Sequence, residues 1–451
     1  MNKYKKFNFF NRRQVISYIL SVSALANIQK ISLASNTDVI VIGAGVSGLA
    51  STEYLLQKGK SVICIEANNR IGGRCFTDNN IFGVPYDVGA HWITNNKTNP
   101  YISYWNDNKI EEFNLYEDKE QKTIYDGKKR LISPEDKPLW DQYNSILEDI
   151  GKSSNKDIAP SEAVSNKSSE WYNTAHLIIG PYDMAKDFNH FSCMDWWNYL
   201  EPETKSWFCT EGYGTLVKHR WRNVPVQFNT RAQTIKWGSR GVQIETNNGT
   251  ISSQVCILTV STGVLASGKI NFIPTLPMEK YDSFSGISMG IYNHIALQFK
   301  KDFFPHETDG YIYYKLNNQK TSFPRGVAGL TNSSGSNLSY FDAGGEFARE
   351  LEKAGEEASI DFVLGELKTI FGSKVDKNLI KAHATSWASN PFTLGSYASA
   401  EPGSFHLRKV LRQSVGDRIF TAGEATAEEW ATVAGATRSG LRAAKEVIKI
   451  L

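Results

Sequence analysis

The sequence has few cysteines, little net charge and few long apolar runs, and each of these shortages argues against a class of protein. Its five cysteines, an odd number, include no pair at Cys-x-x-Cys spacing, so neither a disulfide framework nor a zinc or other metal site is expected. The formal net charge is only +3, and lysine and arginine form no long runs, which argues against nucleic-acid binding. After the N-terminus no apolar run reaches the length of a membrane span, so we expect no stable span in the mature chain.

The first 35 residues differ in character from the rest of the chain. A basic start is followed by a modest apolar stretch and by two small-residue cleavage patterns that end at Ala26 and Ala34. These three parts occur in the order of a signal peptide over residues 1–35. The pair Arg12-Arg13 before the apolar stretch resembles a twin-arginine signal. We therefore expect export of the folded protein to the periplasm, and the alternative is a cytoplasmic protein with a basic tail.

The remaining chain has the composition of a globular protein, with 41% apolar residues for a packed core. A length of 451 residues indicates two or three domain-sized units. Two short apolar runs, 38–42 and 61–65, flank a helical stretch at 46–57, which predicts a strand–helix–strand unit. Further expectations are a hairpin turn at 247–249, a helical region at 345–371 and a final helix at about 433–450.

The first turn of this unit carries the glycine pattern GxGxxG. Gly43 permits a tight turn, Gly45 lets a pyrophosphate approach the backbone, and Gly48 lets the helix pack on the strand. The helix N-terminus then supplies N–H donors and a favourable dipole for phosphates. Glu66 follows 18 residues after Gly48, at the end of the second strand, where a carboxylate can accept from both ribose hydroxyls. The pattern therefore predicts a dinucleotide site.

The residues after the second strand point to FAD. Residues 66–74 have the EAxxRxGGR spacing of the flavin-containing amine oxidases (monoamine and polyamine oxidase-like), and the chain resembles this family. Gly73 allows close backbone approach, while Arg70 and Arg74 can neutralise pyrophosphate charge. The resemblance implies that Gly89, Ala90, His91 and Trp92 pass along the flavin ring, and that the strand ending at Ala232 contacts the adenine side.

The C-terminal part carries the second half of the resemblance. It implies that the segment with Gly423 and Glu424 contacts FAD, with Glu424 bonded to the ribityl chain. Thr432 and Val433 open the last helix, whose N-terminus would stabilise negative charge on the reduced flavin. Ser396 stands where animal monoamine oxidases carry the cysteine that bonds the flavin. The FAD is therefore expected to be non-covalent.

The resemblance also implies a set of residues around the substrate. Trp387 and Tyr397 belong to the family's catalytic-chamber segment, and Tyr397 matches one wall of an aromatic cage before the flavin. Thr432 takes the place of the second cage tyrosine of animal monoamine oxidases, and Trp430 is a candidate for part of that wall. His294 stands where many members have a lysine that binds a water near flavin N5. We expect this histidine to hold the same water, and the alternative is a core histidine with a satisfied hydrogen bond.

From residue 36 onward the motifs occur in the family's order. The resemblance implies a two-lobed α/β fold, with a discontinuous Rossmann-like FAD-binding domain at 36–95, 205–285 and 375–451 and an α+β substrate-binding domain at 96–204 and 286–374. It implies oxidation of a small-molecule amine's C–N bond to an imine, which hydrolyses to a carbonyl and ammonia or a smaller amine. Oxygen, reduced to hydrogen peroxide, is the expected acceptor, and a cytochrome or quinone is the alternative. No pattern specifies an oligomeric state.

Three other functions stay open at this point. An L-amino-acid oxidase needs an arginine for the substrate carboxylate, and in the best-known branch it follows soon after the GGR segment, where this chain has Ala90-His91-Trp92. A carotenoid-type desaturase or porphyrinogen oxidase shares the GGR segment but predicts a wider apolar channel and no cage tyrosine. A protein that uses FAD only as a structural or sensing ligand has no need of the cage segment.

Overall fold

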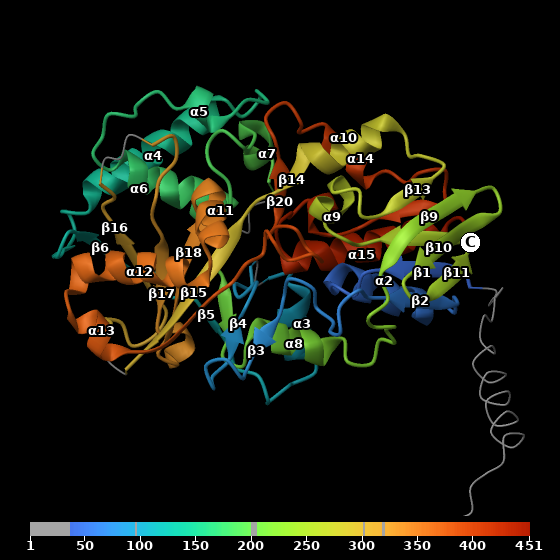
Figure 1. Ribbon diagram of the computed structural model, residues 1–451, viewed down its shortest axis with the longest axis horizontal. Coiled ribbons are helices and arrows are strands. Elements are labelled where there is room, and N and C mark those ends of the chain that lie inside the picture. The colour runs from blue at the N-terminus through green and yellow to red at the C-terminus, as the bar shows by residue number, and fades with distance from the viewer. Residues whose placement is uncertain (1–36, 95–96, 200–204, 301–302, 318–320) are drawn as a thin grey trace, which may run out of the picture.

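The computed structural model describes residues 37–451 apart from four short gaps, at 95–96, 200–204, 301–302 and 318–320. The signal segment expected over residues 1–35 lies outside the described residues. Within the described ranges no helix is both long enough and apolar enough to cross a bilayer. The described chain forms two lobes, which lie side by side in Figure 1.

The first lobe is built on a parallel sheet with the strand order β2–β1–β12–β21. Its strands are β1 (Val39–Ile42), β2 (Val62–Ile65), β12 (Val255–Leu258) and β21 (Ile419–Thr421). Both faces of this sheet are covered, which is why its strands are apolar runs without alternation. Helix α2 (Val46–Gln57) joins β1 to β2, so the expected strand–helix–strand unit is confirmed. Three distant parts of the chain contribute strands, and the lobe is therefore discontinuous.

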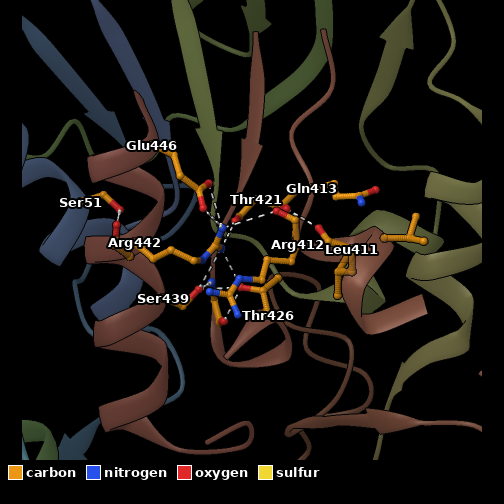
Figure 2. Close-up of polar contacts among 12 residues, drawn as sticks. Ser51, Leu411, Arg412, Gln413, Thr421, Thr426, Ser439, Arg442 and Glu446 are labelled. Atoms are coloured by element: carbon orange, nitrogen blue, oxygen red, sulfur yellow. Dashed lines mark hydrogen bonds and ion pairs between the residues drawn. The ribbon is translucent and has the colours of Figure 1, made fainter. Parts of the chain in front are cut away.

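The last helix, α15 (Val433–Ile448), packs on α2 across the face of this sheet. A methyl group on Gly440 would lie 2.1 Å from the carbonyl oxygen of Ser47, so only glycine allows this approach. Arg442 holds the helix to the end of β21, because it donates to the Thr421 carbonyl at 2.6 Å and pairs with Glu446 at 3.0 Å (Figure 2). These contacts fix the helix relative to the parallel sheet.

The opposite face of the parallel sheet is covered by a second sheet with the order β11–β10–β9–β13. Its strands are β9 (Ala232–Gly238), β10 (Gly241–Thr246), β11 (Gly249–Ser253) and β13 (Asn271–Ile273). The hairpin turn expected near residue 248 joins β10 to β11 and is confirmed. The helices on this side are α9 (Thr262–Ala266), α10 (Met278–Gly286) and α14 (Leu407–Arg412).

The second lobe contains a mixed seven-stranded sheet with the order β19–β15–β18–β17–β16–β6–β7. Its strands are β6 (Gln121–Asp126), β7 (Lys129–Leu131), β15 (Tyr292–Phe299), β16 (Gly310–Tyr314), β17 (Ala328–Thr331), β18 (Leu338–Gly344) and β19 (Leu379–Ala384). One face packs against α4 (Lys137–Lys152), α5 (Pro160–Ala163) and α6 (Tyr172–Leu177), which continues as a π-helical turn at Ile178–Tyr182.

The other face of this sheet is covered by helices α11 (Gly345–Ala354) and α12 (Glu356–Phe371), followed by α13 (Lys374–Asn378). The helical region expected at 345–371 is thus two helices. The chain breaks at Gly355, whose φ of +103° favours glycine.

Short elements fill the region between the lobes. They are β3 (Thr77–Asp78) with β4 (Tyr86–Asp87), β5 (Leu115–Glu117) with β8 (Trp207–Cys209), β14 (Ile287–Met289) with β20 (Ala398–Ala400), and helices α3 (Pro100–Asp107), α7 (Cys193–Trp197) and α8 (Tyr213–Arg220). Two segments differ from the expected domain ranges. Tyr101 and Leu115 pack in the core of the first lobe, and β19 pairs with β15 in the second. All five cysteines are buried and free.

Candidate active site

The loop between β1 and α2 has the geometry that its glycines predict. Gly43 has a φ of +107°, and a methyl group on Gly48 would lie 1.9 Å from the Gly43 carbonyl oxygen. Beside Gly45, in contrast, no described atom beyond its two chain neighbours lies within 4 Å of where a methyl carbon would sit. The buried Ser47 hydroxyl, in the first turn of α2, has no hydrogen-bond partner among the described residues. An open space and an unpaired hydroxyl at a helix N-terminus fit the pyrophosphate of FAD.

Glu66 lies at the end of β2, where its carboxylate is held by the backbone. It accepts from the N–H of Ala44 at 2.7 Å and from the N–H of Asn68 at 2.8 Å. A carboxylate has about four lone-pair sites, so each oxygen keeps an acceptor position for a ribose hydroxyl. Ala232, the first residue of β9, lines the same cavity. This end of the cavity therefore fits the adenosine part of FAD.

Glu424 ties three segments together at the cavity. Its carboxylate is 2.8 Å from the Arg74 guanidinium and accepts from the N–H of Ala398 at 3.3 Å and of Ala431 at 3.1 Å. Arg74 also donates to the Ser396 carbonyl at 2.8 Å. Arg74 is thus paired with a protein carboxylate, and this pairing comes in addition to the contact with the pyrophosphate that we expect of Arg74.

A second arginine, Arg70, holds the backbone near the expected pyrophosphate position. Arg70 donates to the Gly73 carbonyl at 2.8 Å, and its guanidinium lies 4.1 Å from the centre of the Phe76 ring. At the other side of the cavity, Gly423 has a φ of +134° and precedes the turn that carries Glu424.

Helix α15 begins at the cavity wall. Thr432 is its N-cap residue, and the threonine hydroxyl accepts from the N–H of Gly435 at 2.8 Å. Val433 is the first helical residue, and both Thr432 and Val433 line the cavity. The first turn carries no acidic side chain, so its remaining N–H groups keep their positive potential. This potential suits the negative charge that a reduced flavin acquires.

The segment expected along the flavin ring is held by side chains of the second lobe. The Trp387 indole donates to the Val88 carbonyl at 3.2 Å, and His294 lies 2.9 Å from the Gly89 carbonyl. A methyl group on Gly89 would lie 1.9 Å from the Arg74 carbonyl oxygen, so this glycine permits the close approach. Trp92 donates to the Tyr311 hydroxyl at 3.0 Å. The segment therefore forms a fixed wall.

One cavity of about 560 Å³ brings these residues together. Every site residue predicted from the sequence lines it except Gly48, whose task is helix packing. The lining set is Gly43, Gly45, Glu66, Arg70, Gly73, Arg74, Gly89, Ala90, His91, Trp92, Ala232, His294, Trp387, Tyr397, Gly423, Glu424, Trp430, Thr432 and Val433. Segments separated by almost 400 residues thus meet at a single site.

The aromatic wall differs in one member from the expected cage. The ring of Tyr397 lies 6.0 Å from that of Tyr292, and its hydroxyl donates to the Asp183 carbonyl at 3.0 Å. Trp430 lines the cavity but packs edge-on against Tyr199, at 4.8 Å. The ring beside Tyr397 is therefore Tyr292, which sequence reasoning did not single out.

The expected role of His294 as the ligand of a water is wrong. Its Nδ1 lies 2.5 Å from the carboxylate of Asp342, and its Nε2 lies 2.9 Å from the Gly89 carbonyl oxygen. Both ring nitrogens are taken by protein atoms, so none is left for a water. Asp342 was missed, although a carboxylate within the apolar run 338–344 is a signal that sequence reasoning can use.

A two-lobed fold with this dinucleotide loop and an adjoining aromatic cavity defines a class, the FAD-dependent oxidoreductases. The model of the family of flavin-containing amine oxidoreductases matches residues 46–448. The chain therefore belongs to this family, its cofactor is FAD, and it is an enzyme that oxidises amines.

The chain is also similar to individual proteins along most of its length. Polyamine oxidase 4 of Oryza sativa subsp. japonica is 27% identical over 92% of this chain and 89% of its own length. Protein FLOWERING LOCUS D of Arabidopsis thaliana is 28% identical over 91% of this chain, which spans only 55% of that protein. A solved structure of putrescine oxidase bound to putrescine has a TM-score of 0.75 at 18% identity and covers 92% of this chain and 99% of its own. At this identity the structural likeness shows the fold.

We predict that acid denaturation releases the FAD into the supernatant. The Ser396 hydroxyl donates to the Tyr292 carbonyl at 2.8 Å and accepts from the N–H of the same residue at 2.8 Å, and it is not a thiolate that can attack the flavin ring. The measurement is absorbance and mass of the supernatant and of the precipitated chain. A flavinylated peptide in the precipitate would contradict the prediction.

Proposed function

We propose that the chain oxidises amines that carry no carboxylate, and that oxygen reoxidises the flavin to give hydrogen peroxide. One observation carries the first part, the lining of the cavity beyond the expected flavin position. The arginines and lysine that line the cavity are Arg70, Arg74, Arg231 and Lys269, and all come from the segments of the first lobe. The described segments of the second lobe contribute aromatic rings, the acid Asp183 and His294, whose ring is already paired with the carboxylate of Asp342.

This lining disfavours the alternatives. A substrate carboxylate needs a cationic partner, and an amino-acid substrate would bury its carboxylate against rings. A carotenoid or porphyrinogen has no cation that would be stabilised by the faces of Tyr397 and Tyr292. An aliphatic or aromatic amine fits both features, because its ammonium is attracted by aromatic faces and by Asp183.

The roles of the residues follow from their positions. FAD supplies the hydride acceptor for the amine carbon. The adjacent rings of Tyr397 and Tyr292 form an aromatic wall against which the amine nitrogen lies, and Trp387 holds the wall along the flavin in place. The fixed geometry brings the carbon to the same position in every encounter, which lowers the entropic barrier of the transfer.

The experiment that tests the proposal is peroxide release in air-saturated buffer on a panel of amines and amino acids. Putrescine and longer polyamines head the panel, because the relatives named above include a polyamine oxidase and a putrescine oxidase. Stoichiometric peroxide from an amine supports both parts. Turnover that appears only with a quinone or cytochrome would show that oxygen is not the acceptor. Turnover of amino acids alone would overturn the proposed substrate class.

We predict that Asp183→Asn raises the KM for a cationic amine by roughly fivefold, on the order of 1 kcal/mol, with little change in kcat. Asp183 is exposed where it lines the cavity, so its charge attracts the substrate through a screened field. The wild-type KM should rise with ionic strength, and the variant should lose much of this dependence. Asp282→Asn, which removes an exposed carboxylate of α10 outside the cavity, is the control and should leave KM unchanged.

Export of the folded enzyme is a separate proposal, supported by the order of basic, apolar and small residues in segment 1–35. Fractionation of native-host cells should place the mature chain outside the cytoplasm, with an N-terminus near Asn27 or Ser35. A cytoplasmic protein that keeps Met1 would refute it.

A further inference from the structure

A buried carboxylate outside the family motifs lies at the centre of the second lobe's sheet. Asp342 of β18 is directly opposite His294 of β15, and its side chain is fully buried. Tyr292 is two residues before His294, so it lies on the same face of the strand. One oxygen of Asp342 is 2.5 Å from Nδ1 of His294, and the other accepts from the Tyr292 hydroxyl at 2.7 Å.

The partners of His294 determine how many protons its ring carries. Nδ1 faces the carboxylate of Asp342, and Nε2 lies 2.9 Å from the carbonyl oxygen of Gly89. A carboxylate oxygen and a carbonyl oxygen can only accept. With Asp342 ionised, both nitrogens donate, and the ring is then an imidazolium paired with the carboxylate.

The surroundings of the ring favour the same state. Burial by itself lowers the pKa of His294, but the charge of Asp342 and the hydrogen bonds to Asp342 and Gly89 outweigh it, so the pKa is raised. The pKa of His91 is lowered, mainly by burial and to a lesser degree by the charge of His294, so this ring stays neutral. The other titratable groups around the ring are Asp87, Tyr292 and Tyr340.

We propose that Asp342 is a positioning residue that fixes two walls of the cavity at once. Through the His294 ring it holds the Gly89 carbonyl, in the segment along the flavin. Through the Tyr292 hydroxyl it holds the ring beside Tyr397, where the amine binds. The assignment of a flavin side and an amine side rests on the proposed function, whereas the protonation of His294 does not.

The protonation state can be read without turnover. The holoenzyme is labelled with ¹⁵N in its eight histidines, and the His294 ring is identified by its absence from the spectrum of His294→Gln. We expect two ring N–H groups on His294 at pH 7 and above, beyond the ordinary histidine pKa of about 6.5. In Asp342→Asn the ring should carry one proton at pH 8. A singly protonated ring in the wild type at pH 7 would overturn the proposal.

The raised pKa of His294 also predicts a pH dependence of stability. Because the folded pKa exceeds the unfolded value of about 6.5, this stabilisation is complete below that pH and is lost as pH rises through the folded pKa. The difference in unfolding free energy between wild type and His294→Gln, measured with urea at a series of pH values, should therefore shrink over this window. A difference that grows with pH would contradict a charged ring.

The positioning role is tested by flavin reduction under anaerobic conditions. Asp342→Asn should shift the visible spectrum of bound FAD and slow its reduction by a saturating amine at least about tenfold. Tyr292→Phe, which disturbs only the amine side, should slow reduction without the spectral shift. Asp309→Asn is the matched control. Asp309 is a buried acid of the same lobe that does not line the cavity, and it accepts a hydrogen bond of 2.6 Å from the Tyr116 hydroxyl.

The outcomes separate this proposal from the function itself. Equal effects of Asp342→Asn and Asp309→Asn would reduce Asp342 to a structural residue and overturn the proposal. If Asp342→Asn does not fold, His294→Gln and Tyr292→Phe test the two walls one at a time. The spectral shift must then appear in His294→Gln and not in Tyr292→Phe. A wild-type enzyme that oxidises no amine refutes the proposed function and leaves the result on ring protonation standing.

Discussion

Gly45→Ala should abolish tight FAD binding while the apoprotein keeps its stability. Alanine fits the backbone at this position, where φ is −66° and ψ is 171°, and no described atom beyond the two chain neighbours lies within 4 Å of the added carbon. The methyl group instead enters the space beside the helix N-terminus that a pyrophosphate needs. We expect the Kd for FAD to rise by about 100-fold or more, equivalent to about 2.7 kcal/mol, as measured by flavin fluorescence titration of the apoprotein.

Gly48→Ala is the control for this result. Its methyl group would lie 1.9 Å from the Gly43 carbonyl oxygen, so α2 must move away from β1. Overpacking of this kind typically destabilises by about 1–3 kcal/mol, and the apoprotein should unfold at a lower temperature. If Gly45→Ala instead lowers the unfolding temperature as much as Gly48→Ala and binds FAD normally, the loop is a structural turn and the cofactor lies elsewhere.

Tyr397→Ala should slow anaerobic reduction of the flavin by an amine at least about tenfold, a loss of about 1.4 kcal/mol in the transition state. The ring forms one face of the amine position beside Tyr292, whereas the pyrophosphate is expected at the glycine loop of residues 43–48. FAD content should therefore stay at the wild-type level, measured by absorbance per chain.

Tyr397→Phe separates the ring from its hydroxyl. It keeps the aromatic face but loses the hydrogen bond to the Asp183 carbonyl, which spans 3.0 Å. Because the face carries the cation attraction, we expect the phenylalanine variant to reduce at close to the wild-type rate. An unchanged rate in Tyr397→Ala would place Tyr397 in the core instead of the amine site.

The cofactor side of the site could be predicted from the sequence because it depends on local patterns. Gly43, Gly45 and Gly48 have separate tasks within one turn, and the spacing to Glu66 follows from one helix and one strand. The structure places these residues as the pattern predicts. The break at Gly355 was within reach too, since a glycine inside a helical pattern signals an interruption.

The substrate side could not be predicted to the same degree, because it depends on strand register. Tyr292 and His294 acquire their partner only when β15 pairs with β18 so that His294 faces Asp342, some 48 residues further along the chain. Short strands carry no signal for such a pairing, and a shift of one residue would turn every side chain to the other face. The same limit applies to β19, whose pairing with β15 of the second lobe no local pattern predicts.

This FAD-dependent amine oxidase is proposed to act on amines without a carboxylate. Anaerobic stopped-flow reduction tests this proposal most directly with matched pairs that differ only by that group, putrescine against ornithine and 2-phenylethylamine against phenylalanine. We expect that at least one amine bleaches the oxidised flavin band and that its amino-acid counterpart leaves the band unchanged. Bleaching by the amino acids and not by the amines would contradict it.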